Sequence, residues 1–319
     1  KQTIGLAAGD PGKRLIFDNH VVWKTQGTTL KAVFPLKAHN FNARYNLGLG
    51  TIERPSNHSR QYEVPSREWI DLTDTSGNYG VSVLEDGKYG SDKPDENTLR
   101  LTLLHTPVAN AYHDQATQDI GTHQFTYALY GHQGNWNTGG TEWQGRFVNQ
   151  PMRAYGVPKH QGRMGKTFSF ARLNKAGVAI RAIKKAEDDK SYIIRLQELT
   201  GDGTEDVRLE AGTGITSAIE VDGQERKIAD LPPTTNGHLE LDMKPYAIRS
   251  ISVSLDPFPI IASQTSSRPM NLPYNRDVIS ADNDRSDGAL DDSGRTYPAG
   301  MLPETLTSED IRFNLADAR

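Results

Sequence analysis

The stretch VLEDGKYG, residues 83–90, brings an acid, a base and an aromatic ring together between two glycines. Asp86-Gly87 after alternating apolar residues is typical of a β-hairpin, because glycine takes a positive φ without steric cost. Asp86, Lys88 and Tyr89 also offer a carboxylate, an ammonium group and an aromatic face to a bound molecule. The residues alone leave both interpretations open.

Two tryptophans, Trp136 and Trp143, lie in the polar, glycine-rich segment GNWNTGGTEWQG. This segment follows a predicted strand, and aromatic side chains exposed on a loop indicate recognition. A loop tryptophan more often closes the end of a sandwich, so this is the favoured interpretation and binding is the alternative. Trp69 alternates with Asp71 in REWIDLTD and is expected in a core or an interface.

The segment ADNDRSDGALDD carries five aspartates, and calcium prefers carboxylate and carbonyl oxygens. An EF-hand loop needs acids at positions 1, 3 and 5, glycine at 6 and glutamate at 12. Here the third acid is displaced and no glutamate follows. We predict a solvated acidic loop, and a calcium site at Asp282, Asp284 and Asp287 is the alternative.

No other set of residues is singled out for catalysis. The chain has no cysteine, which excludes a disulfide, a thiolate nucleophile and cysteine-bound zinc. Its histidines form no HExxH pattern, no serine lies in a GxSxG elbow, and no glycine-rich loop has Walker spacing. GTHQFTYALYGH places His123, Phe125, Tyr127 and Leu129 on one face of a half-buried strand, which predicts a hydrogen-bonded histidine.

Composition narrows the class of protein. The 319 residues carry a net charge of -4, so no basic excess points to nucleic acid as a partner. No apolar run reaches the roughly 20 residues that a membrane-spanning helix needs. The first residues, KQTIGLAAGDPGK, lack the apolar core of a signal peptide and look like the start of a fragment.

Short alternating runs recur about every 8 to 14 residues, with Gly, Asn, Asp or Pro between them. This spacing is typical of a β-sandwich, so we predict an all-β fold. LIFDNHVVWKTQGTTLKAVFPL predicts two or three strands with a turn at TQGT. VAIRAIKKAEDD is predicted as a strand because valine and isoleucine favour one.

Composition changes after about Leu255, where DPFPIIASQTSSRPMNLP has the character of a linker. The residues beyond it are rich in Asp, Asn and Gly and show little periodicity. We predict a large β domain at 1–255, a linker at 256–272 and the start of an additional, incomplete β module at 273–319.

Six blocks follow one another in an order that resembles a known family: FPLKAHNFNARYNLGLGTIERPSNHS, YEVPSREWIDLTD, YGVSVLEDGKYG, NTLRLTLLHTP, GTHQFTYALYGHQGNW and LNKAGVAIRAIKKAEDDKSYIIRLQEL. The resemblance is to the C-terminal half of family 38 glycoside hydrolases, the α-mannosidases, in their bacterial, vacuolar and cytosolic branch. LDMKPYAIRSISV resembles the closing strand of that branch. The tail resembles a further module of some large bacterial members.

The resemblance implies a large β-supersandwich of the galactose-mutarotase-like kind. In the family, the zinc ligands, the aspartate nucleophile and the acid/base carboxylate lie in an N-terminal α/β domain, which nothing here resembles. The implied function is that of an accessory domain, inactive alone, of an exo-acting retaining α-mannosidase that hydrolyses terminal α-linked mannose. The implied partners are mannose-containing glycans, the enzyme's own N-terminal catalytic domain and a second copy in a homo-oligomer. The compartment stays open between the cytoplasm and the periplasm or exterior of a bacterium.

The resemblance also bears on the candidate residues. The matching loop of the branch reads Asn-Asp-x-Lys-Tyr-Gly, so Glu85 stands where asparagine is usual. It implies that Asp86, Lys88 and Tyr89 either contact a sugar or hold the interface with the catalytic domain. Trp136 and Trp143 become candidate sugar platforms. A stand-alone carbohydrate-binding module and a mutarotase-like enzyme are the alternative functions.

Overall fold

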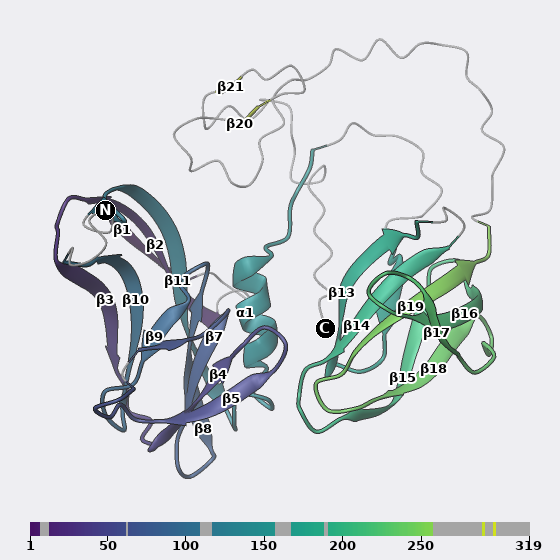
Figure 1. Ribbon diagram of the computed structural model, residues 1–319, viewed down its shortest axis with the longest axis horizontal. Helices are drawn as coiled ribbons and strands as arrows, with labels where there is room; N and C mark the ends of the chain where they lie inside the picture. The colour runs from purple at the N-terminus through teal and green to yellow at the C-terminus, as the bar shows by residue number, and fades with distance from the viewer. Residues whose placement is uncertain are drawn as a thin grey trace. The chain divides into compact units, whose positions relative to one another are not determined.

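The computed structural model describes residues 1–6, 13–61, 63–108, 117–156, 167–187 and 191–257, and two short strands at 289–290 and 296–297. The chain divides into two compact units (Figure 1). The first, called the N-terminal unit, is Lys1–Pro151 with Leu199–Asp202, and the second, the C-terminal unit, is Met152–Glu198 with Gly203–Arg319. None of the described helices is long and apolar enough to cross a membrane.

The described residues of the N-terminal unit form one helix, α1 (Thr141–Asn149), and eleven strands. The strands are β1 (Gln2–Leu6), β2 (Arg14–Trp23), β3 (Thr28–Pro35), β4 (Asn42–Asn46), β5 (Thr51–Pro55), β6 (Val64–Pro65), β7 (Trp69–Thr73), β8 (Tyr79–Glu85), β9 (Gly90–Asp92), β10 (Thr98–Thr106) and β11 (Gly121–Gln133). Every pair among them is antiparallel.

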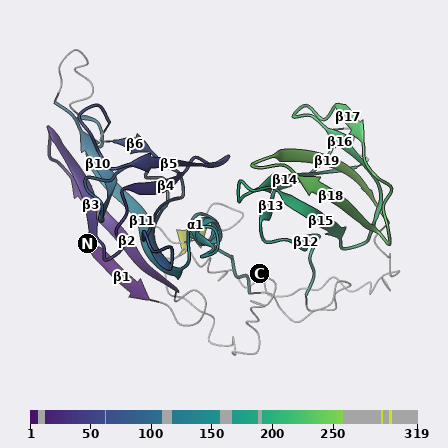
Figure 2. The ribbon, with the colours of Figure 1, turned by 90° about the horizontal axis from the view of Figure 1, so that it is seen from below.

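Two sheets of the N-terminal unit form a sandwich. The larger has the order β1-β2-β11-β8-β7-β4-β5 and the smaller β3-β10-β9-β6 (Figure 2). A hydrophobic core lies between them, where Tyr45, Ile70 and Tyr127 of the larger sheet meet Leu99 and Leu101 of the smaller. The alternation of these residues along their strands places one side chain in two on the core face.

Helix α1 covers part of the opposite face of the larger sheet. Trp69, Leu84, Tyr130 and Trp136 form a second core cluster there, with Val148 of the helix packed against it. Trp69 Nε1–H donates to the Glu142 carboxylate at 2.8 Å, which ties the first turn of the helix to the sheet. The expectation that Trp69 lies in a core is therefore confirmed.

The C-terminal unit is a second sandwich. Its strands are β12 (Ala171–Leu173), β13 (Val178–Lys185), β14 (Tyr192–Glu198), β15 (Thr204–Ala211), β16 (Ile215–Val221), β17 (Lys227–Asp230), β18 (His238–Met243) and β19 (Ile248–Leu255). They form sheets of order β12-β15-β18 and β13-β14-β19-β16-β17. Ile194, Leu196 and Val253 of one sheet pack against Leu209 and Leu239 of the other. The remaining strands, β20 (Ala289–Leu290) and β21 (Thr296–Tyr297), pair with each other.

The all-β prediction is confirmed, including the turn between β2 and β3 and the strand β13. One local expectation is wrong: the segment expected to be a loop with two tryptophans contains α1. Residues 1–255 fall into two units, each with its own core. The predicted limits of the domain, the linker and the tail module stay predictions.

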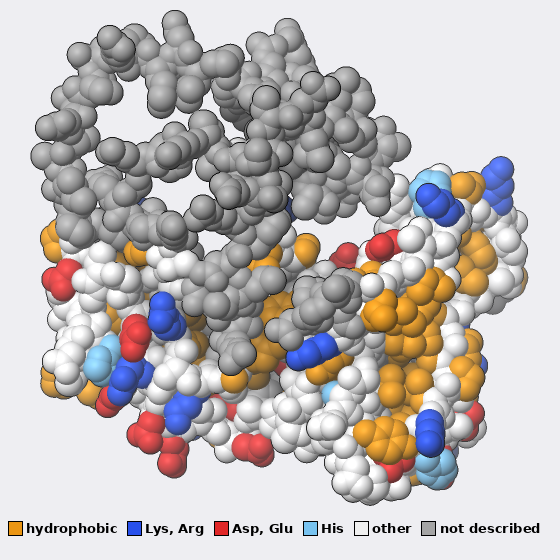
Figure 3. Space-filling view, turned by 180° about the vertical axis from the view of Figure 1, so that it is seen from behind, with side chains coloured by type: hydrophobic (Ala, Val, Ile, Leu, Met, Phe, Trp, Pro, Cys, Tyr) orange, Lys and Arg blue, Asp and Glu red, His pale blue; other side chains and the backbone are white. Residues whose placement is uncertain are grey.

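Apolar side chains are exposed along the first strands of the N-terminal unit. Ile4 and Leu6 in β1 and Val22 in β2 are 57%, 69% and 57% exposed, and Figure 3 shows hydrophobic side chains gathered on one face of this unit. Ile4 and Leu6 lie on one face of the edge strand β1, opposite Phe17 and Leu15 of β2, whereas Val22 lies on the other face of the sheet.

Candidate functional site

The segment between Glu85 and Gly90 joins two different sheets. β8 ends at Glu85 in the larger sheet, paired with β7 and β11, whereas β9 begins at Gly90 in the smaller sheet, paired with β10 and β6. The expectation of a β-hairpin is therefore wrong, and the loop is a crossover at the edge of the sandwich. The expected positive φ of Gly87 is present, at 76°, and a Cβ there would meet nothing within 4 Å.

Glu85 holds the start of this loop. Its side chain is buried, and its Oε2 accepts a hydrogen bond from the Lys88 backbone N–H at 2.7 Å. Its backbone carbonyl accepts from Asn149 Nδ2 of α1 at 2.9 Å. The other carboxyl oxygen, Oε1, is buried and has no hydrogen-bond partner among the described residues.

Burial raises the pKa of Glu85 to about 8, against the opposing effect of the hydrogen bonds that it accepts. The free-energy cost of removing the carboxylate from water is larger than the stabilisation it gains from hydrogen bonds with the Lys88 and Glu68 backbone. The side chain therefore carries a proton at neutral pH. Glu85 acts as a neutral anchor for the loop and not as a surface charge.

Lys88 lies folded against the sandwich. Its Nζ is 4.5 Å from the centre of the Phe125 ring, a cation–π contact. Burial lowers the pKa of Lys88, while Asp119 and Glu85 act in the opposite direction. The side chain is half-buried, so Lys88 is not an exposed charge at the tip of the loop.

Asp86 and Tyr89 are the exposed members of the loop. Asp86 is held by its backbone N–H, which donates to the Thr126 carbonyl at 3.2 Å and leaves its carboxylate at the surface. Tyr89 is 53% exposed, and the Arg67 guanidinium lies 5.4 Å from its ring centre. The loop thus presents a carboxylate and an aromatic ring on a fixed backbone. Whether these residues contact a sugar stays a prediction.

The two candidate tryptophans are not exposed together on a loop. Trp136 is 9% exposed, stacks on Trp69 at 5.2 Å between ring centres, and has the Arg44 guanidinium 5.9 Å from its ring. Trp143 lies on α1, half-buried, with the Arg146 guanidinium 5.1 Å from its ring. Their role as sugar platforms stays a prediction, and the contacts of Trp136 leave little of its faces for stacking.

Two histidines of β11 are held by hydrogen bonds. His123 Nε2 lies 2.7 Å from the Asp119 carbonyl oxygen, which confirms the expected hydrogen-bonded histidine. His132 Nε2 lies 2.7 Å from Asp71 Oδ2, and both side chains are 1% exposed. Burial lowers the pKa of His132, but the hydrogen bond and charge of Asp71 outweigh burial and hold it above its ordinary value.

The proposed calcium ligands Asp282, Asp284 and Asp287 lie outside the described residues. Within the described part of the chain, no group of three or more His, Cys, Asp or Glu side chains could hold a metal ion. The family resemblance implies zinc ligands in the N-terminal catalytic domain, and we assign no zinc ligand to the described residues.

Comparisons with protein families match three parts of the chain. "Glycosyl hydrolases family 38 C-terminal domain" matches residues 1–113, and "Glycosyl hydrolases family 38 C-terminal beta sandwich domain" matches residues 177–251. "AziU2-like beta-sandwich domain" matches residues 265–319, nearly all of them outside the described part. The first match falls in the N-terminal unit, and the second falls in the C-terminal unit except for Leu199–Asp202.

Curated relatives are named α-mannosidases. Alpha-mannosidase 2C1 of Homo sapiens is 29% identical over 273 residues, which are 81% of this chain and 24% of that protein. Alpha-mannosidase of Saccharomyces cerevisiae is 28% identical over 75% of this chain and 22% of its own length. The chain thus spans about a quarter of the length of these relatives.

Solved structures share the fold. A family 38 glycosyl hydrolase from Enterococcus faecalis superposes with a TM-score of 0.61 at 17% identity, over 75% of this chain and 28% of its own. An α-mannosidase from Enterococcus faecalis V583 superposes with a TM-score of 0.61 at 16% identity, over 75% of this chain and 27% of its own. With two family matches in chain order and α-mannosidase relatives across both units, this chain is similar over both units to the C-terminal β-sandwich domains of glycosyl hydrolase family 38.

Proposed function

We propose that this chain is the accessory C-terminal region of an exo-acting, retaining α-mannosidase that hydrolyses terminal α-linked mannose. The observation that carries the proposal is the match to named α-mannosidases, which extends over 81% of this chain but only 24% of the relative. The larger remainder of such a protein is where we place the catalytic domain.

The chemistry itself is assigned to that catalytic domain. A retaining glycosidase needs two carboxyl groups about 5 to 5.5 Å apart, one as nucleophile and one as acid/base. In the candidate loop, Glu85 is buried on the Lys88 N–H and Asp86 is exposed on a crossover, so they do not form such a pair facing one ligand. A zinc ion bound in the catalytic domain would contact mannose hydroxyls and favour distortion of the ring.

In this proposal, the role of this chain is to support the catalytic domain and to close one side of the active site. The crossover loop is fixed by two hydrogen bonds, one from the Lys88 N–H to the Glu85 carboxyl group and one from the Asp86 N–H to the Thr126 carbonyl. The Asp86 carboxylate and the Tyr89 ring stay exposed. A carboxylate accepts hydrogen bonds from sugar hydroxyls, and a tyrosine ring stacks on a pyranose face. The exposed side chains of Ile4 and Leu6, on one face of the edge strand β1, support a contact with the catalytic domain.

The remaining partners follow from this assignment. Mannose-containing glycans are the substrates, the enzyme's own N-terminal catalytic domain is the intramolecular partner, and the whole protein forms a homo-oligomer. It works in the cytoplasm, or in the periplasm or exterior, of a bacterium. A calcium ion at Asp282, Asp284 and Asp287 would be a separate structural site in the tail.

The test compares two proteins on p-nitrophenyl α-mannoside, with and without added zinc. The purified chain should give no turnover, whereas the longer protein with its catalytic domain should release α-mannose as the first product, detected by proton NMR. Zinc-dependent turnover by the chain alone would refute the assignment. Release of β-mannose by the longer protein would refute retention.

A further inference from the structure

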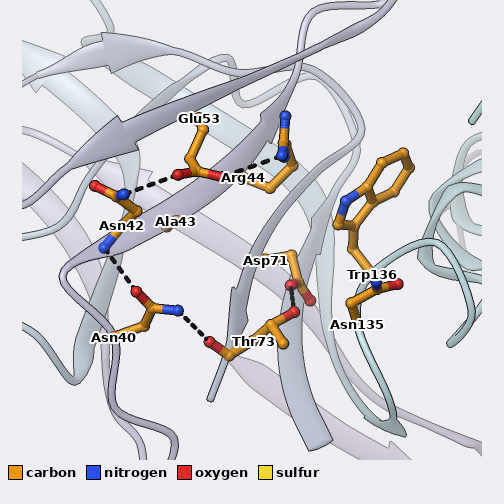
Figure 4. A pocket seen from close by; sticks show the side chains of 9 residues that line it. All are labelled: Asn40, Asn42, Ala43, Arg44, Glu53, Asp71, Thr73, Asn135 and Trp136. Atoms are coloured by element: carbon orange, nitrogen blue, oxygen red, sulfur yellow. Dashed lines mark hydrogen bonds and ion pairs between the residues drawn. The ribbon is translucent and has the colours of Figure 1, made fainter. Parts of the chain in front are cut away.

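A polar cavity lies in the N-terminal unit, away from the crossover loop. It is about 260 Å³ in volume and opens over β4, β5 and β7 beside the turn that follows β11 (Figure 4). Thr73, in its wall, pairs with Gly80 at the start of β8, whereas the crossover loop follows Glu85 at the end of β8. The cavity and the loop are therefore at opposite ends of one strand.

The size of the cavity limits the ligand. Clefts that take drug-sized ligands are roughly 300 to 1,000 Å³, and this one is about 260 Å³. It fits a small molecule of one ring. Its rim is open to solvent, since the side chains of Arg44 and Glu53 are 32% and 50% exposed, while Asp71 in its wall is buried.

Fixed polar groups line the rim. Asn42 Nδ2 donates to Glu53 Oε1 at 2.8 Å, and Arg44 Nη2 donates to Glu53 Oε2 at 3.1 Å. Arg44 and Glu53 are direct cross-strand partners on β4 and β5, so the sheet register sets their spacing. Figure 4 shows this row of side chains along one side of the cavity.

The side chains of Glu53 and Arg44 on this rim have donors and acceptors that their contacts with each other and with Asn42 do not use. A carboxylate offers about four acceptor positions and a guanidinium five donors, and the described contacts use only some of these. A hydroxyl group both donates and accepts. Two neighbouring hydroxyls on a ring can therefore donate to Glu53 and accept from Arg44 at once.

The charged groups of the cavity lie in pairs. Arg44 forms an ion pair with Glu53, and Asp71 Oδ2 lies 2.7 Å from His132 Nε2, where the carboxylate raises the pKa of His132 and so favours its protonated form. Neither an anion nor a cation finds an uncompensated opposite charge, and burying a charge without a partner is costly. An uncharged polyhydroxyl ligand is the class that this lining favours.

Trp136 adds an apolar part to the wall. Trp69 stacks on it and Arg44 lies over its ring, so a ligand meets the edge of the indole. Asn40 fixes the opposite side, because its amide accepts from the Asn42 N–H at 3.0 Å and donates to the Thr73 carbonyl at 2.9 Å. The cavity thus has a rigid polar side and a rigid aromatic side.

We propose that this cavity is a binding site for one neutral sugar residue, at the opposite end of β8 from the crossover loop. The proposal does not rest on mannosidase activity, because binding to the cavity needs only this chain. Its failure would leave the proposed function untouched, and loss of the proposed function would leave the cavity site untouched.

The test is saturation-transfer NMR on the purified chain with methyl α-mannoside, methyl β-galactoside, mannose 6-phosphate and inorganic phosphate. We expect transfer to at least one neutral glycoside, and signals at least about fivefold weaker for Asn42→Ala and Glu53→Ala. Glu240→Ala is the matched control, because Arg208 and Glu240 form a cross-strand pair at 3.3 Å in the other unit. This control should bind as the unchanged chain does.

Three results would overturn the proposal. The first is no transfer to any neutral sugar, and the second is transfer that Asn42→Ala and Glu53→Ala leave unchanged. The third is tighter binding of phosphate or mannose 6-phosphate than of the neutral glycosides, which would contradict the charge argument. Melting temperatures of all variants within about 2 °C of the unchanged chain exclude loss of folding as the cause.

Discussion

Replacing Glu85 by glutamine should stabilise the N-terminal unit in a pH-dependent way. Glu85 is buried with one oxygen unpartnered, and its pKa is raised from 4.5 to about 8. The folded state therefore binds a proton that the unfolded chain releases above pH 4.5. Glutamine has nearly the same shape and needs no proton to be neutral.

The magnitude follows from the pKa difference. A group whose pKa is raised on folding contributes fully below the unfolded value and loses that contribution as pH rises through the folded value. At pH 7, keeping Glu85 protonated costs the folded state about 3 kcal/mol, because pH 7 lies 2.5 units above the unfolded-state pKa of 4.5 and each unit corresponds to about 1.36 kcal/mol. We expect Glu85→Gln to raise the free energy of unfolding by about that amount at pH 7 and by close to nothing at pH 4.

Tryptophan fluorescence isolates the relevant unit, because all four tryptophans, Trp23, Trp69, Trp136 and Trp143, lie before residue 151. Urea unfolding followed by this signal should be measured at several pH values between 4 and 9. Glu96→Gln is the control, since the Glu96 side chain is 47% exposed. If Glu85→Gln and the unchanged chain lose stability in parallel between pH 5 and 8, then Glu85 is not buried as a neutral acid.

Three further substitutions test the neighbourhood. Lys88→Ala should lower stability by about 1 to 2 kcal/mol because it removes the contact with Phe125, and Lys88→Met should recover part of this loss in the same urea titration. Gly87→Ala should cost about 1 to 2 kcal/mol from its positive φ alone; no change in the midpoint would contradict the described backbone. Asp71→Asn should lower the free energy of unfolding by about 3 to 5 kcal/mol, with most of the loss below pH 6.5. The pKa of His132 is raised in the folded state, so the stability that its protonated ring contributes beside Asp71 is lost as pH rises through that folded-state pKa. An equal loss of stability at pH 5 and pH 9 would contradict this.

The strands were predictable because their signal is local. Alternating apolar residues and β-branched side chains specify β2, β3 and β13 without knowledge of their partners. The family resemblance added the sandwich, whose two matched domains the comparisons confirm. Helix α1 was missed because it is only nine residues long, begins after Gly140 and contains Gly145.

The errors at the candidate site have one physical cause. Asp86-Gly87 specifies a turn, but no local signal says which sheet the next strand will join. The burial of Trp136 depends on Trp69, and that of Glu85 on β11 and α1, segments distant in sequence. Once Glu85 is buried, its proton follows from the environment of the folded state, which sequence patterns do not encode.

The most direct test of the proposed role is kcat/KM of the longer protein for an α-mannoside after Asp86→Ala. Asp86 is exposed on a backbone fixed by Thr126, so the substitution should leave the melting temperature within about 2 °C. A hydrogen bond from a substrate hydroxyl to a charged group is worth about 1.5 to 3 kcal/mol, so kcat/KM should fall at least about tenfold if the contact forms in the transition state. An unchanged kcat/KM, equal to that of the exposed control Glu96→Ala, would contradict a place for this loop in the active site.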